Sequence, residues 1–306
     1  MLWIMHGQFL NRPSMKYLMK KNYLNFFLLS LIISCTSDNQ TNNHIQKYLY
    51  LGHIYHSDSL IDNRISSLAL EDYDQIWLGG DLCSETTASY GTLEYLDEIF
   101  DLNNPNTHWT LGNHDIRNGN LNWIKEKTGR PFFYSNSFQK ITLIVLNTFF
   151  FMEGMYDTIN MNFQYEMVKN ICDTIENNNY LVVLMHGMMW KNIPGLDSAE
   201  NYANTDCSHF IMHKTPDMTF SEGIYPLLRQ VQHKGIEVIC ISGDFGQKQT
   251  SYEANSEDNI IFIGSGITSN TPYHSKFPSA GQDDKYLELE YNTLTDELSW
   301  VFKKLQ

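Results

Sequence analysis

The chain has 306 residues, a formal net charge of −14, and a composition that is 42% hydrophobic and 13% aromatic. This apolar content suffices for a substantial core, so disorder of the whole chain is excluded. The acidity argues against a nucleic-acid-binding surface, because phosphate backbones are bound by clustered Lys and Arg side chains. A phosphorylated substrate stays compatible with it, because a bound metal ion supplies local positive charge.

The amino-terminal segment predicts an export signal. A lysine-containing stretch precedes the apolar residues 23–34, which are fewer than the ~20 needed to span a bilayer. Small and aliphatic residues directly before Cys35 resemble a bacterial lipoprotein signal, with an ordinary secretory peptide as the alternative. The resemblance implies a signal peptide over residues 1–34 and lipidation at Cys35. The protein would then be exported and lipid-anchored to the bacterial membrane, at its periplasmic face or at the cell surface.

Residues 35–46 are polar and are expected to form a tether, and residues 47–306 are expected to form one domain. The first half of this domain alternates between strand and helix patterns, and this β-α-β-α-β order predicts a sheet with helices on its faces. The last two strands of this half have a tight link and are expected to form a hairpin. The expected strands are Lys47–His53, Gln75–Gly79, Thr107–Leu111, Phe132–Ser137 and Ile141–Leu146, and the expected helices are Ser59–Leu70, Thr87–Phe100 and Leu121–Lys127.

The second half is richer in strands. Together with the first half it predicts an α/β fold of two packed mixed β-sheets flanked by helices, in the layer order α/β/β/α. Residues 187–221 are long and irregular for a connection, so a cap insertion that faces the substrate is expected there. The expected strands are Tyr180–Met185, Ile236–Ile241, Ile260–Gly264, Tyr286–Tyr291 and Leu298–Phe302, and the expected helices are Phe163–Ile175 and Glu222–His233.

Polar clusters follow five of the predicted strands. Each cluster has an ordinary structural explanation when it is taken alone, such as a turn for Gly80-Asp81 or a satisfied core histidine for His186. Together they deliver His, Asp and Asn side chains to one rim of the sheets, which predicts the metal site of an α/β enzyme. The clusters are His53 to His56, Gly80-Asp81, Gly112-Asn113-His114-Asp115, His186-Gly187 and Gly243-Asp244.

With these motifs the chain resembles the calcineurin-like metallophosphoesterases over about residues 47–303. That family's pattern is Asp-x-His, Gly-Asp, Gly-Asn-His-Asp/Glu, a lone His, and Gly-His-x-His. The second, third and fourth motifs are matched here by Gly80-Asp81, Gly112-Asn113-His114-Asp115 and His186. The resemblance implies that Asp81 bridges two metals, that Asn113 and His186 are metal ligands, and that His114 contacts the phosphate and the leaving group.

Two motifs depart from the family pattern. The first reads His53-Ile54-Tyr55, and the last reads Gly243-Asp244-Phe245-Gly246. One metal site would then consist of Asp81, Asn113, His186 and Asp244, an oxygen-rich set that suits Mn, Fe, Zn or Mg as a divalent ion. A second site would use His53, with Tyr55 as a candidate phenolate ligand, and it lacks a ligand at Gly246. The second metal is therefore expected to be weaker, different or absent.

The resemblance implies metal-dependent hydrolysis of a phosphate mono- or diester by a metal-activated water at the cell envelope. The partner would be a phosphorylated small molecule or an envelope-associated phosphoester, with membrane contact through the lipid anchor and no nucleic-acid binding. His114 would stabilise developing charge or protonate the leaving oxygen. Asp115 would either orient His114 or cap the helix after it.

Two alternatives remain. The altered motifs favour a catalytically degenerate phosphoesterase-fold lipoprotein that binds or scaffolds, whereas retention of His114 opposes it. The same rim could also serve a metal enzyme that hydrolyses a non-phosphate ester.

Overall fold

The computed structural model describes residues 44–151, 157–205, 211–214, 217–267 and 278–306, without the side chains of 151, 211–214 and 217. The expected signal peptide, Cys35 and most of the expected tether lie outside these residues. In the part of the chain that is described, no helix has both the length and the apolar character required to cross a bilayer.

The first sheet has the strand order β13-β12-β1-β2-β3. Strands β1, β2 and β3 run parallel, while β12 pairs antiparallel with β1 and β13 pairs antiparallel with β12. The sheet is therefore mixed, with its three parallel strands ending at the same edge. The bounds are β1 Ile45–Leu51, β2 Gln75–Leu78, β3 Thr107–Trp109, β12 Lys285–Asn292 and β13 Glu297–Lys304.

The second sheet has the order β10-β11-β9-β6-β5-β4. Its four central strands are parallel, and the two edge strands β10 and β4 are antiparallel to their neighbours. The β4–β5 pairing confirms the predicted hairpin, whereas β10 was not expected from the sequence. The bounds are β4 Tyr134–Phe138, β5 Ile141–Val145, β6 Tyr180–Met185, β9 Glu237–Ser242, β10 Ser251–Asn255 and β11 Ile261–Ser265.

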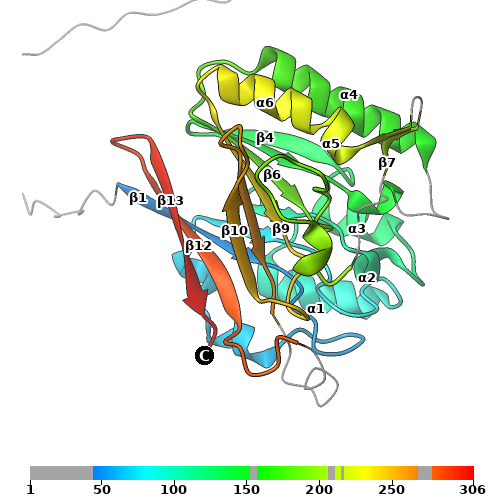
Figure 1. Cartoon of the computed structure of the whole chain (residues 1–306). Helices are drawn as coiled ribbons and strands as arrows, with labels where there is room; N and C mark the ends of the chain where they lie inside the picture. The colour runs from blue at the N-terminus through cyan, green and yellow to red at the C-terminus, as the bar shows by residue number, and fades with distance from the viewer. Residues whose placement is uncertain (1–43, 152–156, 206–210, 215–216, 268–277) are drawn as a thin grey trace, which may run out of the picture. The chain divides into compact units, whose positions relative to one another are not determined.

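Helices cover the outer faces of both sheets. Helices α4 and α6 lie side by side over the second sheet, while α1 and α3 pack on the first (Figure 1). The α-helices are α1 Tyr90–Phe100, α2 Asn113–Ile116, α3 Asn122–Thr128, α4 Thr158–Thr174, α5 Phe220–Gly223 and α6 Tyr225–His233, and a small hairpin joins β7 Ile211–Lys214 to β8 Asp217–Thr219.

The predicted helix over Ser59–Leu70 was wrong. The structure has two 3-10 helices there instead, η1 Asn63–Ser67 and η2 Leu70–Asp72. The hydroxyls of Ser66 and Ser67 donate to backbone carbonyls three residues earlier, which offers the backbone an alternative to α-helical bonding. Two further 3-10 helices, η3 Thr148–Phe151 and η4 Ala199–Asn201, lie in later connections.

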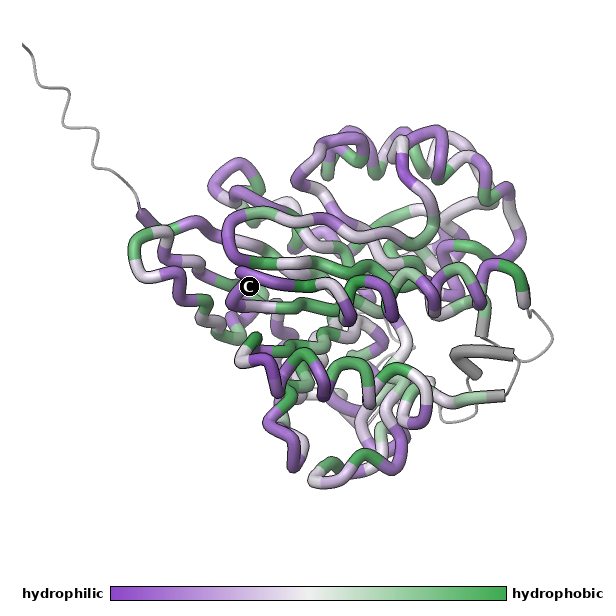
Figure 2. Tube along the Cα trace, turned by 90° about the horizontal axis from the view of Figure 1, so that it is seen from above, coloured by the Kyte–Doolittle hydropathy of each residue, from purple (hydrophilic) through white to green (hydrophobic). Residues whose placement is uncertain are grey.

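Three apolar clusters correspond to the three layer boundaries. One joins α4 and α6 to the second sheet, one joins α1 and α3 to the first sheet, and one lies between the two sheets. The central cluster contains large, fully buried side chains such as Tyr48, Tyr50 and Trp77. Figure 2 shows apolar residues concentrated along the inner strands and hydrophilic residues along the outer segments. The α/β/β/α arrangement expected from the sequence is thus confirmed.

Glycines let the two sheets meet at the carboxyl ends of their parallel strands. A Cβ atom placed on Gly243, after β9, would lie 2.0 Å from the carbonyl oxygen of Gly79, after β2. A Cβ on Gly52, after β1, would lie 2.2 Å from the oxygen of Ser265 and 2.7 Å from the Cα of Gly243. Backbone atoms fill all the space that a side chain would need, so these positions bring the strand ends of both sheets into direct contact.

We predict that Gly243→Ala destabilises the fold by about 1–3 kcal/mol, because the added methyl group forces the two strand ends apart. Urea unfolding measures the loss. Gly91→Ala is the matched control: at this exposed position in α1 an added Cβ would lie 3.5 Å from the Ser89 hydroxyl oxygen, so the substitution should be neutral or slightly stabilising. Equal stability of Gly243→Ala and wild type would contradict the close-approach interpretation.

Candidate metal centre

Asp81 lies at the centre of the site, in a turn directly after β2. Gly80 and Asp81 both have positive φ angles, 86° and 54°, so the chain reverses sharply at the sheet edge. The Oδ1 atom of Asp81 accepts a hydrogen bond from the backbone N–H of His114 at 2.9 Å. The second oxygen, Oδ2, is thereby directed towards the histidines around it.

Three histidines present their Nε2 atoms to this one oxygen. The distances to Oδ2 of Asp81 are 3.3 Å for His186 and 4.0 Å for both His53 and His114. The Nδ1 atom of each ring faces a backbone carbonyl. That of His186 lies 2.8 Å from the oxygen of Gly79, that of His53 lies 3.3 Å from Ile267, and that of His114 lies 3.0 Å from Ser84. Because a carbonyl only accepts, each Nδ1 carries a proton, and in the neutral ring the Nε2 lone pair points inward. This is the tautomer that a metal-ligating histidine requires.

Asp244 joins the same cluster from the second sheet. Its Oδ1 atom lies 3.9 Å from Nε2 of His186, and its Oδ2 atom accepts from the backbone N–H of Thr205 at 3.0 Å. Ligand atoms of His53, Asp81 and Asp244 lie within 4.8 Å of one another. Donor atoms that each lie ~2.0–2.2 Å from one ion are ~3–4.4 Å from one another. The donor atoms of the cluster would therefore need to move only slightly closer together to bind an ion.

The donors fit a cation rather than a closed hydrogen-bond network. Nε2 of His186 is buried and has no hydrogen-bond partner among the described residues, although the Asp81 carboxylate is close by. All four side chains of His53, Asp81, His186 and Asp244 are nearly inaccessible to solvent. Two buried carboxylates without a nearby fixed cation are costly, and a divalent ion would neutralise them.

The pKa values of these groups in the metal-free protein reflect the same crowding. Burial lowers the pKa of His186, but the Asp81 and Asp244 carboxylates outweigh burial and raise it to about 10. Burial raises the pKa of Asp81, but His186, His114 and His53 outweigh it and hold the pKa well below its usual range. Burial lowers the pKa of His53 despite both carboxylates. At neutral pH the metal-free site therefore holds a protonated His186 beside an ionised Asp81.

Asn113 and Tyr55, the other two expected ligands, lie next to this cluster. Asn113 is the first residue of α2, directly before His114, and its role as a ligand stays a prediction. The Tyr55 ring stacks on His114, with centroids 5.0 Å apart, and lies 4.6 Å from the ring of His53. Tyr55 thus fixes the two imidazoles by packing, and its role as a phenolate ligand stays a prediction.

Asp115 organises the loops beneath the site. Its carboxylate accepts from the backbone N–H groups of Asp81, Leu82 and Gly112 at 2.8–2.9 Å, and also from Thr86 and Trp109. The bond from Gly112 closes the first turn of α2, in which Asp115 is the third residue. Asp115 does not cap the helix after it, because the N-cap residue of α3 is Leu121. The alternative, orientation of the His114 ring, does not match the structure, because Nδ1 of His114 bonds to Ser84 instead. Burial and the Asp81 charge raise the pKa of Asp115 to about 6, so the carboxylate is ionised at neutral pH.

Several groups that build the site could not be predicted from the sequence. Thr205 and Asn204, in the segment expected to form a cap, bind Asp244 through their backbone N–H groups. Much of that segment packs into the core: Met188, Trp190 and Ile193 are buried against the second sheet. A cap over the substrate therefore stays a prediction, while its described residues act as a support for Asp244.

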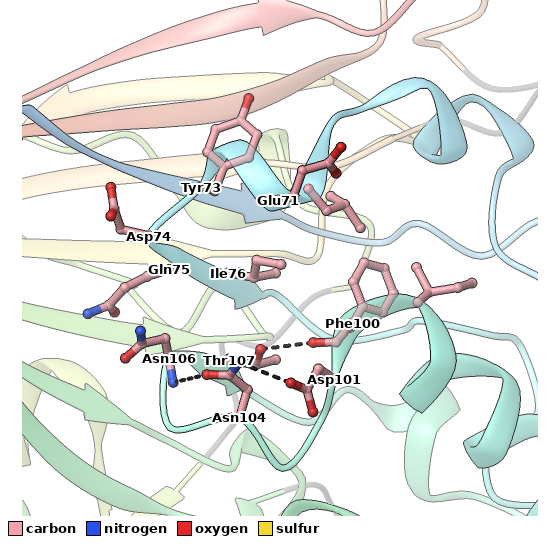
Figure 3. A pocket seen from close by; sticks show the side chains of 12 residues that line it. Glu71, Tyr73, Asp74, Gln75, Ile76, Phe100, Asp101, Asn104, Asn106 and Thr107 are labelled. Carbon is pink, nitrogen blue, oxygen red and sulfur yellow. Dashed lines mark hydrogen bonds between the residues drawn. The ribbon is translucent and has the colours of Figure 1, made fainter. Parts of the chain in front are cut away.

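A pocket of about 390 Å³ lies at the opposite end of the first sheet (Figure 3). It is lined by residues at the amino ends of β2 and β3, including Gln75, Ile76 and Thr107. The candidate metal ligands follow the carboxyl ends of the strands, so this pocket is separate from the site. Two of its polar side chains are paired with each other, through the bond from Asn104 to Asp101.

We predict that Asp244→Asn lowers the affinity for Mn²⁺ or Zn²⁺ by about tenfold or more, because it removes one of two charges facing the ion. Titration calorimetry measures the affinity. Asp283→Asn, at an exposed acidic residue paired with Lys304, is the control and should bind metal like wild type. Unchanged affinity in Asp244→Asn would exclude Asp244 as a ligand.

We also predict that metal binding near neutral pH releases about one proton, from His186. Its pKa is about 10, so the proton must leave before Nε2 can bind an ion, and apparent affinity should rise by about tenfold per pH unit below that pKa. Calorimetry in two buffers of different ionisation enthalpy counts the proton. Binding without proton release would show that His186 stays outside the coordination shell.

The model of the calcineurin-like phosphoesterase family matches residues 31–240, more than half of the chain. The match spans the motifs around His53, Asp81, Asn113-His114 and His186 and ends before Asp244, which the structure places in the cluster. A comparison with curated proteins found no match. The chain belongs to the calcineurin-like phosphoesterase family.

Proposed function

We propose that this protein hydrolyses a phosphate ester, mono- or diester, with a divalent ion held by His53, Asp81, His186 and Asp244. The observation that carries the proposal is the convergence of these donors from both sheets, with the Nδ1 proton of each imidazole directed away from the centre. The family model supports metal-dependent phosphoester hydrolysis as the general reaction. Asn113, which the sequence also predicts as a ligand, is a candidate for a further position around the ion.

The donor set favours some metals over others. Two imidazoles and two carboxylates suit Mn²⁺, Fe²⁺ or Zn²⁺, whereas Mg²⁺ prefers a shell made of oxygen alone. His186 and His53 approach the same pair of carboxylates, so these four side chains would hold the ion together. A bound ion would polarise the phosphoryl group and lower the pKa of a coordinated water.

His114 is placed to serve the leaving group. Its side chain is 18% exposed, whereas those of His53 and His186 are almost fully buried, so it is the imidazole of the cluster that a substrate reaches. Nδ1 is committed to the Ser84 carbonyl, which leaves Nε2 as the atom that exchanges a proton. In the imidazolium form, Nε2 would donate its proton to the leaving oxygen. The stacked Tyr55 ring limits rotation of His114.

The substrate and the location form the finer part of the proposal. A phosphorylated small molecule or an envelope-associated phosphoester would reach the site on an exported protein, anchored to the membrane by a lipid at Cys35. The lysine-rich and apolar residues before Cys35 support this location.

We predict that His114→Ala lowers kcat for phenyl phosphate by about a hundredfold, because this poor leaving group needs a proton. The loss should be smaller for 4-nitrophenyl phosphate, whose leaving group is a weaker base. His233→Ala, at an exposed histidine of α6, should keep wild-type kinetics.

Metal content must be measured in parallel. Retention of metal in the inactive His114→Ala variant supports the assigned role, and loss of metal would refute it. A wild-type protein that binds metal but hydrolyses no phosphate mono- or diester would instead support a binding or scaffold lipoprotein. Activity insensitive to phosphate and vanadate would point to a non-phosphate ester.

A further inference from the structure

Arg117 forms the C-cap of α2, three residues after His114, and contributes a cation that the reaction described above does not use. Its Nη2 atom donates to the carbonyl oxygen of Ser84 at 3.0 Å, and the same oxygen accepts from Nδ1 of His114 at 3.0 Å. The guanidinium and the imidazole are therefore neighbours. The Nε2 atom of His114 faces Asp81, and the Nδ1 atom of the same ring shares the Ser84 carbonyl with Arg117.

The backbone segment of Ser84 and Glu85 is held in place by hydrogen bonds to Ser57 and Asp58. The backbone N–H groups of Ser84 and Glu85 donate to the carbonyls of Ser57 and Asp58 at 3.0 Å, and the Ser84 hydroxyl donates to the Asp58 carboxylate at 2.8 Å. The position of the Ser84 carbonyl, which both His114 and Arg117 use, is thus fixed independently of either side chain.

Arg117 is incompletely paired in this setting. Of the two carboxylate oxygens of Glu85, Arg117 pairs with Oε1 alone, at 3.1 Å. The other oxygen, Oε2, accepts from the Asn118 amide at 2.9 Å. The Nε atom of Arg117 is buried and has no hydrogen-bond partner among the described residues. A guanidinium binds an anion best through two parallel N–H groups, so the Glu85 contact leaves capacity for a better ligand. The side chain is 37% exposed, which leaves it accessible to one.

We infer that Arg117 binds an anionic substituent, a carboxylate or a phosphate, on the leaving group of the substrate. The inference rests on the proposed function, in which His114 serves the leaving oxygen, since the leaving group then extends from His114 towards Arg117. Glu85 occupies Arg117 in the free protein and is exchanged for the substrate anion. In a chain with a net charge of −14, such a local cation offsets the repulsion that an anionic leaving group meets.

The test compares two substrates that differ in one charge: 4-carboxyphenyl phosphate and 4-carbamoylphenyl phosphate. Wild type with Mn²⁺ bound should have a KM about fivefold lower for the carboxylate substrate than for the carbamoyl substrate. This is the effect expected of a half-exposed charge-assisted hydrogen bond. Arg117→Met should abolish this ratio, Arg117→Lys should keep part of it, and Glu85→Gln should increase it. Arg229→Met, at an exposed arginine of α6, is the matched control and should keep the wild-type ratio.

A KM ratio that survives Arg117→Met would overturn the inference. An equal fall in kcat for both substrates at an unchanged KM ratio would also overturn it, because Arg117 would then only support the Ser84–Glu85 segment and His114. Binding of 4-carboxybenzylphosphonate and 4-carbamoylbenzylphosphonate, measured by calorimetry, repeats the comparison without turnover. If wild type hydrolyses neither phosphate yet binds the carboxylate analogue more tightly through Arg117, the proposed hydrolysis fails and the anion site stands. Equal binding of both analogues overturns the anion site.

Discussion

The backbone contact between the two sheets at their carboxyl edges is the constraint on which the site depends. Gly52 and Gly243 each approach the other sheet so closely that its backbone atoms occupy the space where a Cβ would lie, and the carbonyl of Gly79 is one of those atoms. This contact brings His53 and Asp244, the residues after Gly52 and Gly243, close to Asp81, which follows Gly79 by two residues. The cross-sheet bond from His186 to the Gly79 carbonyl then fixes both the distance and the tautomer of the ring.

Electrostatics explains why these side chains tolerate burial. Asp81 has one oxygen bound to the His114 backbone and the other surrounded by three imidazole Nε2 atoms. In the metal-free protein, a proton on His186 offsets part of the buried negative charge. A divalent ion would replace that proton and neutralise both carboxylates. Binding of the ion and the charge state of His186 are therefore linked, as for other sites built from protonatable ligands.

The sequence predicted the layers and the five strand ends because both depend on local patterns. Apolar runs such as Tyr180–Met185 match the observed strand, and polar residues that follow parallel strands must share one edge. It did not predict β10, since Ser251–Asn255 is short and polar, nor the 3-10 helices near Asp62, where side-chain bonds compete with the α-helix.

Within the site, the side chains were predictable and their backbone partners were not. The carbonyls of Gly79, Ser84 and Ile267 fix the three imidazoles, yet any residue type supplies a carbonyl. Asp115 left two interpretations open in the sequence, and only the tertiary contacts with Leu82 and Thr86 decide for support of the loops.

The most direct test of the central claim is a crystal structure of the protein with Mn²⁺ or Zn²⁺, read by anomalous scattering. The account predicts a peak at ~2.0–2.3 Å from Nε2 of His186 and from carboxylate oxygens of Asp81 and Asp244. Saturating metal without a peak between these side chains, or with peaks only elsewhere on the protein, would contradict it.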